Sequence, residues 1–471
     1  MIRLSVFDDD QVKAIHQATL RVLSESGVVL SHAQGRALLL EAGATLEEER
    51  VLLPPELVDW AVAQAPRTVT IRGRGGQSRT LGDGNLYWHN LGGARDVFDA
   101  KSGLKRPTVL QDVRDSARLL DALEHASTVT PFFTPADVPG ELMSLAMYSH
   151  SLPHTSKPLH GPGVQNQAEV RYAVRLAEVI GPPAEVLSLS VSPVSPLYLP
   201  DDGVAAIIEI ARLGIPFAPL PCPTAGTTAP FSISGALVQQ NAEVLAAVVL
   251  AQVVHPGLPV VYCGRLAMME PRTGSSVWGG VELGLASAGT VQLGHYYHLP
   301  VNVYGFSTNS HVLDLQNGFE RALNAAIPAL AGADELSGIG EMEAGVMGSY
   351  AQMVADDEIA ASVARIRQPI STEPDALAVE VIAEVMRGSH NFMGQRHTKR
   401  YLRAGEVLVT ELAERRPWEV WEREGKEGMG ERAQAKAERL LATHQVALLS
   451  PAEERELDAI MDAAEKELVS G

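Results

Sequence analysis

Cysteine is nearly absent from this chain of 471 residues, which contains only Cys222 and Cys263. Two thiols cannot build a disulfide framework, so a reducing compartment fits best. The first twenty residues carry early acidic side chains and no continuous apolar core, which is unlike a secretory signal. The apolar run 244–254 is too short to span a bilayer. We therefore expect a cytoplasmic protein.

Basic residues are few as well. The chain has 38 Lys and Arg residues against 57 Asp and Glu residues, a formal net charge of −19. Such a surface repels phosphate backbones and anionic lipid, so we expect neither a nucleic acid nor a membrane as a partner. Hydrophobic residues make up 46% of the chain, enough for a large core. The composition is that of an ordinary globular protein.

Short apolar or β-branched runs alternate with longer helical patterns over most of the chain. The expected strands are residues 128–133, 157–161, 187–191, 216–220, 260–264, 301–306, 336–340 and, with a weaker pattern, 389–393. About eight such units in succession indicate a (β/α)8 TIM barrel, and a doubly wound sheet is the alternative. No dinucleotide fingerprint supports that alternative. We expect an N-terminal helical region with a small β excursion over 1–106, the barrel over 107–400 and a helical cap over 401–471.

Functional residues of such barrels lie at the C-terminal ends of the strands and in the loops that follow them. That rule selects a substrate site and names no catalytic residue. Aromatic faces with one or two carboxylates suit a quaternary ammonium group, whereas any single ring is more simply a core residue. The end of the weakest expected strand, residues 389–393, adds His390 and Phe392 to the candidate residues of this site. The main candidates are Phe133, His160, Tyr262, Arg265, Tyr304, Phe306, Ser307, Asn309, His311, Glu341 and Glu343.

Metal ligation is a second interpretation of the same region. His295 and His298 have i, i+3 spacing on an expected helix, while Cys222 and Cys263 end neighbouring strands, and a zinc ion accepts such ligands. No CxxC or HExxH pattern supports a metal site, so we expect none. The interpretation as a serine hydrolase has still less support, because no GxSxG motif surrounds the candidate nucleophile Ser307.

Several segments together resemble the trimethylamine methyltransferase (MttB-like) family. They include TAGTTAPFSISGALVQQNAEVLA (224–246), VELGLASAGTVQLGHYYHLPVNVYG (281–305), residues 313–334 and 342–359, and HNFMGQRHTKRYL (390–402). The resemblance runs nearly from end to end. It implies a (β/α)8 barrel that moves a methyl group from an amine to the cobalt of a separate, small corrinoid protein. It also favours a homo-oligomer.

Archaeal members of that family carry pyrrolysine in a G-S-pyrrolysine-S-D motif, and the matching residues 305–309 here read GFSTN. Ser307 stands at the pyrrolysine position. The chain is thus similar to the non-pyrrolysine members, which include glycine betaine:corrinoid methyltransferases, and the expected donor is glycine betaine or a related betaine. A zinc-dependent corrinoid methyltransferase of the methanol or thiol type and a non-catalytic betaine-binding protein are the alternatives.

Residue type and position at the ends of the expected strands suggest roles for individual side chains. Tyr304 and Phe306 are expected to face the cation of the donor, and Asn309, His311 or Arg265 its carboxylate. The corrinoid would be carried by the partner protein, and this chain would hold no metal of its own.

Overall fold

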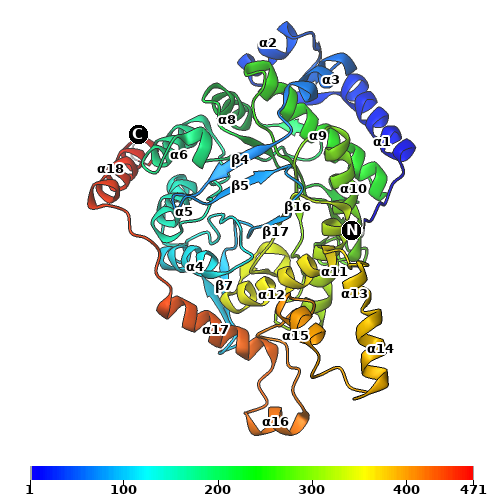
Figure 1. Cartoon of the computed structure of the whole chain (residues 1–471). Coiled ribbons are helices and arrows are strands. Elements are labelled where there is room, and N and C mark those ends of the chain that lie inside the picture. The colour runs from blue at the N-terminus through cyan, green and yellow to red at the C-terminus, as the bar shows by residue number, and fades with distance from the viewer. Residues whose placement is uncertain (1–2, 470–471) are drawn as a thin grey trace.

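The computed structural model describes residues 3–469 and has an α/β fold around a ring of parallel strands (Figure 1). One parallel ladder joins β9 (Leu189–Val191) to β11 (Phe217–Pro219). A second joins β13 (Tyr262–Gly264), β16 (Val301–Tyr304), β17 (Glu335–Ser337) and β6 (Tyr87–Trp88). Single parallel bridges link the other neighbours: His89 to Thr128, Val129 to Leu159, Gly163 to Ser190 and Phe217 to Val260. Each segment is parallel to the next, and the last pairs with the first.

One long helix follows each segment of the ring, which confirms the expected alternation of strands and helices. α6 illustrates the pattern, because Val170, Ala173 and Ala177 recur at helical spacing and are all buried. The eight helices are α4 (Leu110–Ala122), α5 (Met143–Ser151), α6 (Gln167–Glu178), α8 (Asp201–Arg212), α9 (Ile233–Val254), α10 (Val281–Tyr296), α11 (Leu315–Ala331) and α12 (Tyr350–Arg367).

Two expectations about the strands were wrong. The first strand of the ring is β6, which lies inside the supposed N-terminal excursion and pairs with β17, so the central sheet begins before residue 107. Residues 389–393 form a turn and bend, and all of them are exposed. His390 and Phe392 are therefore not at the end of a barrel strand. The expected boundary at 400/401 also falls within a helix, α15 (Arg396–Arg403).

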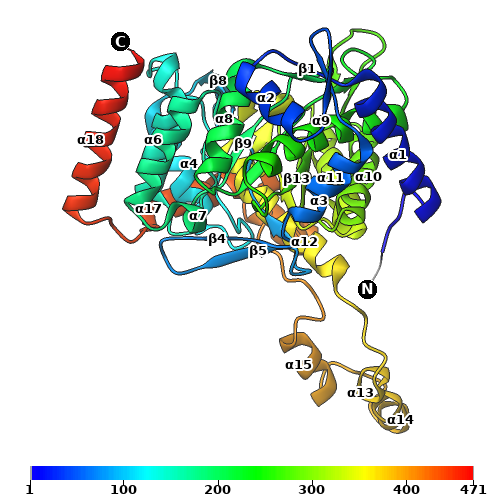
Figure 2. The same cartoon turned by 90° about the horizontal axis from the view of Figure 1, so that it is seen from above.

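A β-hairpin covers the N-terminal end of the ring (Figure 2). It consists of β4 (Val69–Arg72) and β5 (Ser78–Leu81), which pair antiparallel. Val69, Ile71 and Leu81 are buried against residues of the ring. The hairpin thus closes the end opposite to the loops that follow the strands, and it brings Arg79 into the interior.

The N-terminal segments pack around α9. α1 (Asp9–Arg21) and α3 (Pro55–Gln64) contact this helix, and α2 (Ala33–Glu41) lies beside it as well. β1 (Val28–Leu30) pairs with β10 (Tyr198–Leu199) on one side and with β3 (Arg50–Leu52) on the other, and β2 (Thr45–Glu47) extends that sheet. α9 is the one helix of residues 3–469 that is long and apolar enough to cross a membrane, and 78% of its most apolar window is buried inside the protein.

Short hairpins stand at the C-terminal end of the ring. β7 (Asp96–Asp99) and β8 (Leu104–Pro107) follow β6, while β18 (Glu341–Met342) and β19 (Met347–Gly348) follow β17. The two hairpins join through parallel pairing of β19 with β7. A third small sheet combines β12 (Thr224–Ala225), β14 (Ala267–Met269) and β15 (Ser276–Val277).

The C-terminal part consists of helices. α13 (Pro374–Leu377), α14 (Val379–Arg387) and α15 project away from the ring of strands and its helices (Figure 2). α16 (Trp418–Arg423) follows, and α17 (Met429–Thr443) then returns to pack on α12 and α4. α18 (Pro451–Leu468) packs on α5 and α6, where Tyr172 donates a hydrogen bond to Glu467 at 2.7 Å.

Gly338 sets the turn that supports the loop after β16. Its φ is +114°, and a Cβ atom there would lie 2.4 Å from the backbone oxygen of Phe306. We expect Gly338→Ala to lower the free energy of unfolding by more than about 2 kcal/mol, because backbone strain adds to a clash that no side chain can relieve. Gly43→Ala is the matched control, since φ is +105° but nothing lies within 4 Å. Urea denaturation of both variants measures the difference, and equal losses would show that the clash is unimportant.

Candidate functional site

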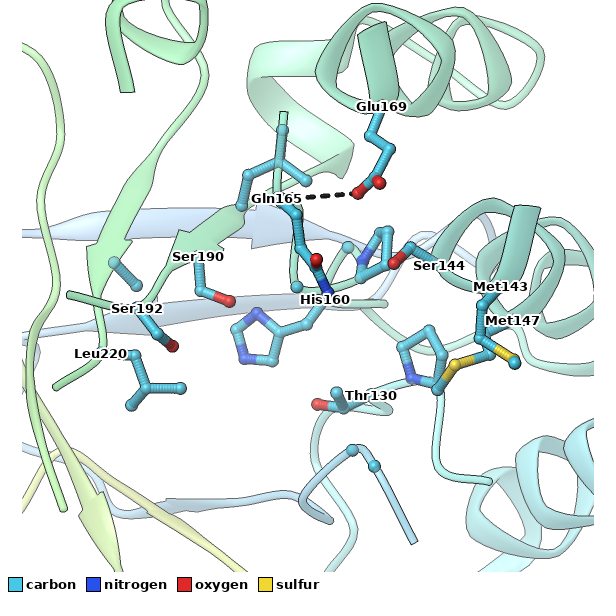
Figure 3. Close-up of a pocket in the computed structure, with 18 of the residues that line it drawn as sticks. Thr130, Met143, Ser144, Met147, His160, Gln165, Glu169, Ser190, Ser192 and Leu220 are labelled. Atoms are coloured by element: carbon cyan, nitrogen blue, oxygen red, sulfur yellow. Dashed lines mark hydrogen bonds between the residues drawn. The ribbon is translucent and has the colours of Figure 1, made fainter. Parts of the chain in front are cut away.

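A cavity of about 800 Å³ opens at the C-terminal end of the ring, the place that the barrel rule indicates (Figure 3). The loops after six of the parallel segments and the helix α5 supply most of its wall, and Leu468 of α18 reaches it. The wall includes His89, Gly92, Thr130, Thr134, Met143, Met147, His160, Gln165, Glu169, Ser190, Ser192, Leu220, Cys263, Arg265 and Asn302.

A buried ion pair lies beneath this cavity. Arg79 of the hairpin donates a hydrogen bond to Glu335 of β17, and both side chains are almost fully buried. A second nitrogen contact of Arg79 joins its Nη1 to Nε2 of His160 at 2.9 Å. Because a guanidinium can only donate, His160 accepts at Nε2 and donates from Nδ1 to the Ser188 hydroxyl at 2.6 Å.

Asn302 of β16 connects this pair to His89. Its side-chain nitrogen donates to Glu335 at 2.5 Å and to Nε2 of His89 at 2.9 Å. The other ring nitrogen of His89 donates to Thr130 at 3.0 Å. Burial, and then the nearby arginines, hold the pKa of His89 and of His160 well below the usual range. Both imidazoles are therefore neutral and fixed in one tautomer.

Arg265 is the one cation in the cavity wall. Its exposed fraction is 4%, and its guanidinium donates to the side-chain and backbone oxygens of Asn302 at 2.5 and 3.1 Å. The guanidinium carbon lies 5.7 Å from the centre of the Tyr304 ring. Nε has no hydrogen-bond partner, and within residues 3–469 no carboxylate forms an ion pair with this side chain. Within residues 3–469 the wall thus contains a buried positive charge without an ion-pair partner, although the Glu341 carboxyl is near enough to oppose the lowering of the pKa of Arg265 by burial.

The three predicted aromatic residues do not line the cavity. Tyr262, Tyr304 and Phe306 are each at most 2% exposed and belong to the interior. Tyr262 donates to Asn241 of α9 at 2.8 Å, and Phe306 stacks on Trp88 with ring centres 4.9 Å apart. The wall of the cavity contains no Phe, Tyr or Trp. The expected aromatic cage for a cation is therefore absent from it.

Other predicted residues support the loops instead. Phe133 is buried against Phe132, with ring centres 4.5 Å apart, although the following residue, Thr134, does reach the cavity. Asn309 accepts hydrogen bonds from the backbone of Trp278 and Gly279, both at 2.7 Å. These contacts hold two loops together and leave the side-chain oxygen of Asn309 occupied.

Ser307 is fully buried, and its hydroxyl has no hydrogen-bond partner. The segment 343–345 crosses over its loop, where the amide of Ala344 donates to the carbonyl of Thr308 at 2.8 Å. Ser307 is not among the residues that line the cavity. The hairpin after β17 thus separates this serine from the open site.

The two predicted carboxylates have different surroundings. Glu341 is 1% exposed and accepts a hydrogen bond from the hydroxyl of Tyr304. Burial, and then the charge of Asp356, raise the pKa of Glu341 well above the usual range, while the nearby Arg265 guanidinium opposes that rise. Glu343 lies at the surface and pairs with Lys105 at 3.0 Å and with His311 at 3.6 Å. His311 is largely exposed and is not among the residues that line the cavity.

Of the predicted residues, the cavity wall contains His160 and Arg265. Sequence reasoning missed His89 and Asn302 in the wall and Arg79 and Glu335 beneath it. His89 directly follows β6, so assigning LYWHN to the ring of parallel strands, and not to a separate β excursion, would have found it. The other three carried no local signal.

His89, His160 and Glu335 could hold a metal ion by geometry, since one ligand atom of each lies within 4.8 Å of the others. The guanidinium of Arg79 already contacts Glu335 and His160, however, and a second cation there would face its charge. The predicted thiol ligand Cys263 is buried, and burial raises its pKa to about 11, which opposes a thiolate. His295 pairs with Asp334 at 2.9 Å, away from both cysteines.

The neutral state of His160 gives a pH dependence of stability. In the unfolded chain this histidine binds a proton near pH 6.5, whereas the folded state keeps it neutral, so acid favours unfolding. We expect the free energy of unfolding to fall between pH 6.5 and 5 more steeply in the unmodified protein than in His160→Gln, by up to about 1.4 kcal/mol per pH unit. Urea titrations at several pH values measure both slopes. The slopes should coincide near pH 8, and equal slopes at pH 5–6.5 would contradict a buried neutral imidazole.

Comparisons with known proteins agree with the resemblance. The family model described as trimethylamine methyltransferase (MTTB) matches residues 1–469. The chain is 31% identical to the trimethylamine methyltransferase MttB of Methanosarcina barkeri, over 99% of this chain and 96% of the relative. It is 28% identical to the glycine betaine methyltransferase of Desulfitobacterium hafniense, over 98% and 96% respectively. The crystal structure of the M. barkeri monomethylamine methyltransferase shares the fold, with a TM-score of 0.53, 12% identity and coverage of 95% and 90%. The chain belongs to the trimethylamine methyltransferase (MTTB) family and is a methyltransferase.

Proposed function

We propose that this protein transfers a methyl group from a quaternary amine that carries a carboxylate, glycine betaine or a related betaine, to the Co(I) of a corrinoid held by a separate small protein. Arg265 is the observation that carries the proposal. A charged group inside a protein is costly unless a partner compensates it, and Arg265 has polar partners but no carboxylate. A donor carboxylate in the cavity would supply the missing counter-charge and accept charge-assisted hydrogen bonds.

The other end of a betaine is a cation, and the wall offers groups for it. Glu169 is 7% exposed and accepts hydrogen bonds from the Gln165 amide and the Asn166 side chain, both at 2.9 Å. Met143 and Met147 line the wall nearby (Figure 3). In place of the aromatic cage, a carboxylate and polarisable thioethers would surround the trimethylammonium group.

A quaternary donor fits the acid–base state of the site. Its leaving group is a neutral tertiary amine, so methyl transfer needs no proton donor from the protein. His89 and His160 are neutral and already hydrogen-bonded at both ring nitrogens, so neither supplies one. Trimethylamine would leave as an amide anion unless an electrophile captured it, and Ser307 at the pyrrolysine position offers none. The protein would act by positioning and charge recognition.

The methyl acceptor would approach the open end of the cavity. When bound there, a Co(I) corrinoid supplies the nucleophile for the methyl carbon. The volume of about 800 Å³ leaves room beside a small betaine. Leu104, Phe231 and Leu315 lie in segments that follow the C-terminal ends of strands and are 69%, 54% and 86% exposed. These apolar side chains would contact the partner and exclude water from the reacting atoms.

The eight parallel segments, joined in a ring and each followed by a helix, would constitute one (β/α)8 barrel. A cytoplasmic location suits two cysteines outside any disulfide. A zinc enzyme of the methanol or thiol type is disfavoured, because Arg79 lies on the only candidate ligand group of residues 3–469.

The activity itself is testable. We expect the purified protein with a Co(I) corrinoid protein to form methyl-cobalt when glycine betaine or a longer betaine is added, and trimethylamine to be a poor donor. The loss of the Co(I) absorbance measures the transfer. Betaine binding without methyl-cobalt would favour a binding protein. Stoichiometric zinc with activity lost on chelation would favour the zinc type, and efficient use of trimethylamine would contradict the argument on the leaving group.

Arg265→Gln tests the carboxylate contact. Hydrogen bonds to a charged group contribute about 1.5–3 kcal/mol, so the affinity for glycine betaine should fall about 10- to 100-fold. The affinity for choline, which has the same cation and no carboxylate, should change less than about threefold. Calorimetric titration measures both constants.

His311→Ala is the matched control, since this side chain lies at the surface and outside the cavity wall. It should leave both affinities unchanged. Equal losses for betaine and choline in Arg265→Gln would indicate a damaged fold, and a loss of betaine binding in His311→Ala would place the carboxylate outside the cavity.

A further inference from the structure

Residues 368–409, here named the arm, have almost no core of their own. The arm contains α13, α14 and α15, and none of these helices makes an extensive contact with a helix or strand of the ring. At the end of the arm, Arg365 of α12 donates a hydrogen bond to the backbone oxygen of Glu406 at 3.2 Å. Figure 2 shows it standing away from the body, on the side of the covering hairpin β4–β5. Val385 is its one buried residue. A segment that orders three helices around one buried side chain gains little to offset the lost chain entropy.

The arm exposes large apolar side chains instead. Val379, Ile382 and Met386 recur at helical spacing along α14 with exposed fractions of 64%, 47% and 59%. Leu402 of α15 is 60% exposed, and Met393 between the two helices is 83% exposed. Contiguous exposed apolar groups of this kind mark a protein interface rather than a solvated surface.

The charges of the arm are separated along the chain. Its first part is purely acidic and its second part almost purely basic, and only Asp375 and Arg400 form an ion pair within it. The acidic residues from 373 to 384 are Glu373, Asp375, Glu380 and Glu384, with no Lys or Arg among them. The basic residues from 387 to 403 are Arg387, Arg396, Lys399, Arg400 and Arg403, with no Asp or Glu among them.

We propose that the arm pairs with the arm of a second copy of this chain across a two-fold axis. In such an isologous contact the acidic α13–α14 part of each arm faces the basic α15 part of the other, so the charges complement each other twice. The apolar face of α14 is buried between them. The arm leaves the body at the end of α12, on the side away from the cavity mouth, so the contact leaves the mouth open.

The location separates this partner from the methyl acceptor. A corrinoid protein must reach the cavity, which opens at the opposite end of the ring from the hairpin β4–β5. An acidic body of net charge −19 also repels a second acidic body unless complementary charges are aligned. The separated charges of the arm supply that alignment. The inference does not depend on which donor the cavity accepts.

Charge reversal tests the two-fold pairing. Variant A carries Glu380→Lys and Glu384→Lys, and variant B carries Lys399→Glu and Arg403→Glu. We expect the unmodified protein to sediment as a dimer. Variants A and B alone should each self-associate at least about tenfold more weakly, because in either homodimer side chains of the same charge would face each other at both symmetry-related contacts. An equimolar mixture of A and B should restore the dimer as a heterodimer. Sedimentation velocity and native mass spectrometry at low salt measure the oligomeric state of the unmodified protein, of each variant and of the mixture.

An apolar variant and a control complete the experiment. Ile382→Glu with Met386→Glu should yield monomers, whereas Leu448→Glu, at a residue that is 88% exposed and outside the arm, should leave the dimer intact. Far-UV circular dichroism and thermal melting confirm that each variant is folded. The proposal would be overturned if the unmodified protein were a monomer, or if its dimer were unaffected by variant A, variant B and the apolar variant. It would also be overturned if the mixture of A and B failed to restore the dimer. Loss of binding to the corrinoid protein in the apolar variant, with the dimer unchanged, would assign the arm to that partner instead.

Discussion

The buried ion pair between Arg79 and Glu335 determines the floor of the cavity. Arg79 comes from a hairpin outside the ring and Glu335 from a strand within it, so the pair fixes the hairpin to the N-terminal end of the ring. An isolated charge at this depth would be strongly destabilising, and each member therefore requires the other. His160 and Asn302 use the remaining hydrogen-bonding capacity of the pair, which in turn orients the groups that face the cavity.

Much of the fold could be predicted from the sequence, because buried parallel strands are continuous apolar runs and the helices between them have one apolar face. β6 escaped because its short run LYWHN contains polar groups that point into the interior, where His89 is satisfied by Asn302 and Thr130. Residues 389–393 were expected to form a weak strand, but they pair with no strand among residues 3–469. Strand formation depends on such partners, and a local pattern does not contain them.

The site was harder to predict for a related reason. The rule of strand ends found His160 and Arg265, since both lie where a strand meets its loop. It could not find Asn302 or Glu335, which lie at the start of their strands and reach the floor because inward-facing residues form layers inside a barrel. Arg79 enters from a distant hairpin and has no local signature. Tyr304 and Phe306 have the right position along the chain, yet the hairpin after β17 covers them.

The electrostatic state of the interior links these features to specificity. Arg79 is neutralised by Glu335 and both histidines are neutral, whereas Arg265 carries a positive charge that no ion pair compensates within residues 3–469. A neutral or purely cationic amine that filled the cavity would shield this guanidinium from water and leave it without a counter-charge. A zwitterionic donor avoids that cost, because its carboxylate replaces the lost solvent. Discrimination between betaines and simple amines would then rest on the penalty for leaving Arg265 unpaired more than on an aromatic cage, and it would operate before any methyl group moves.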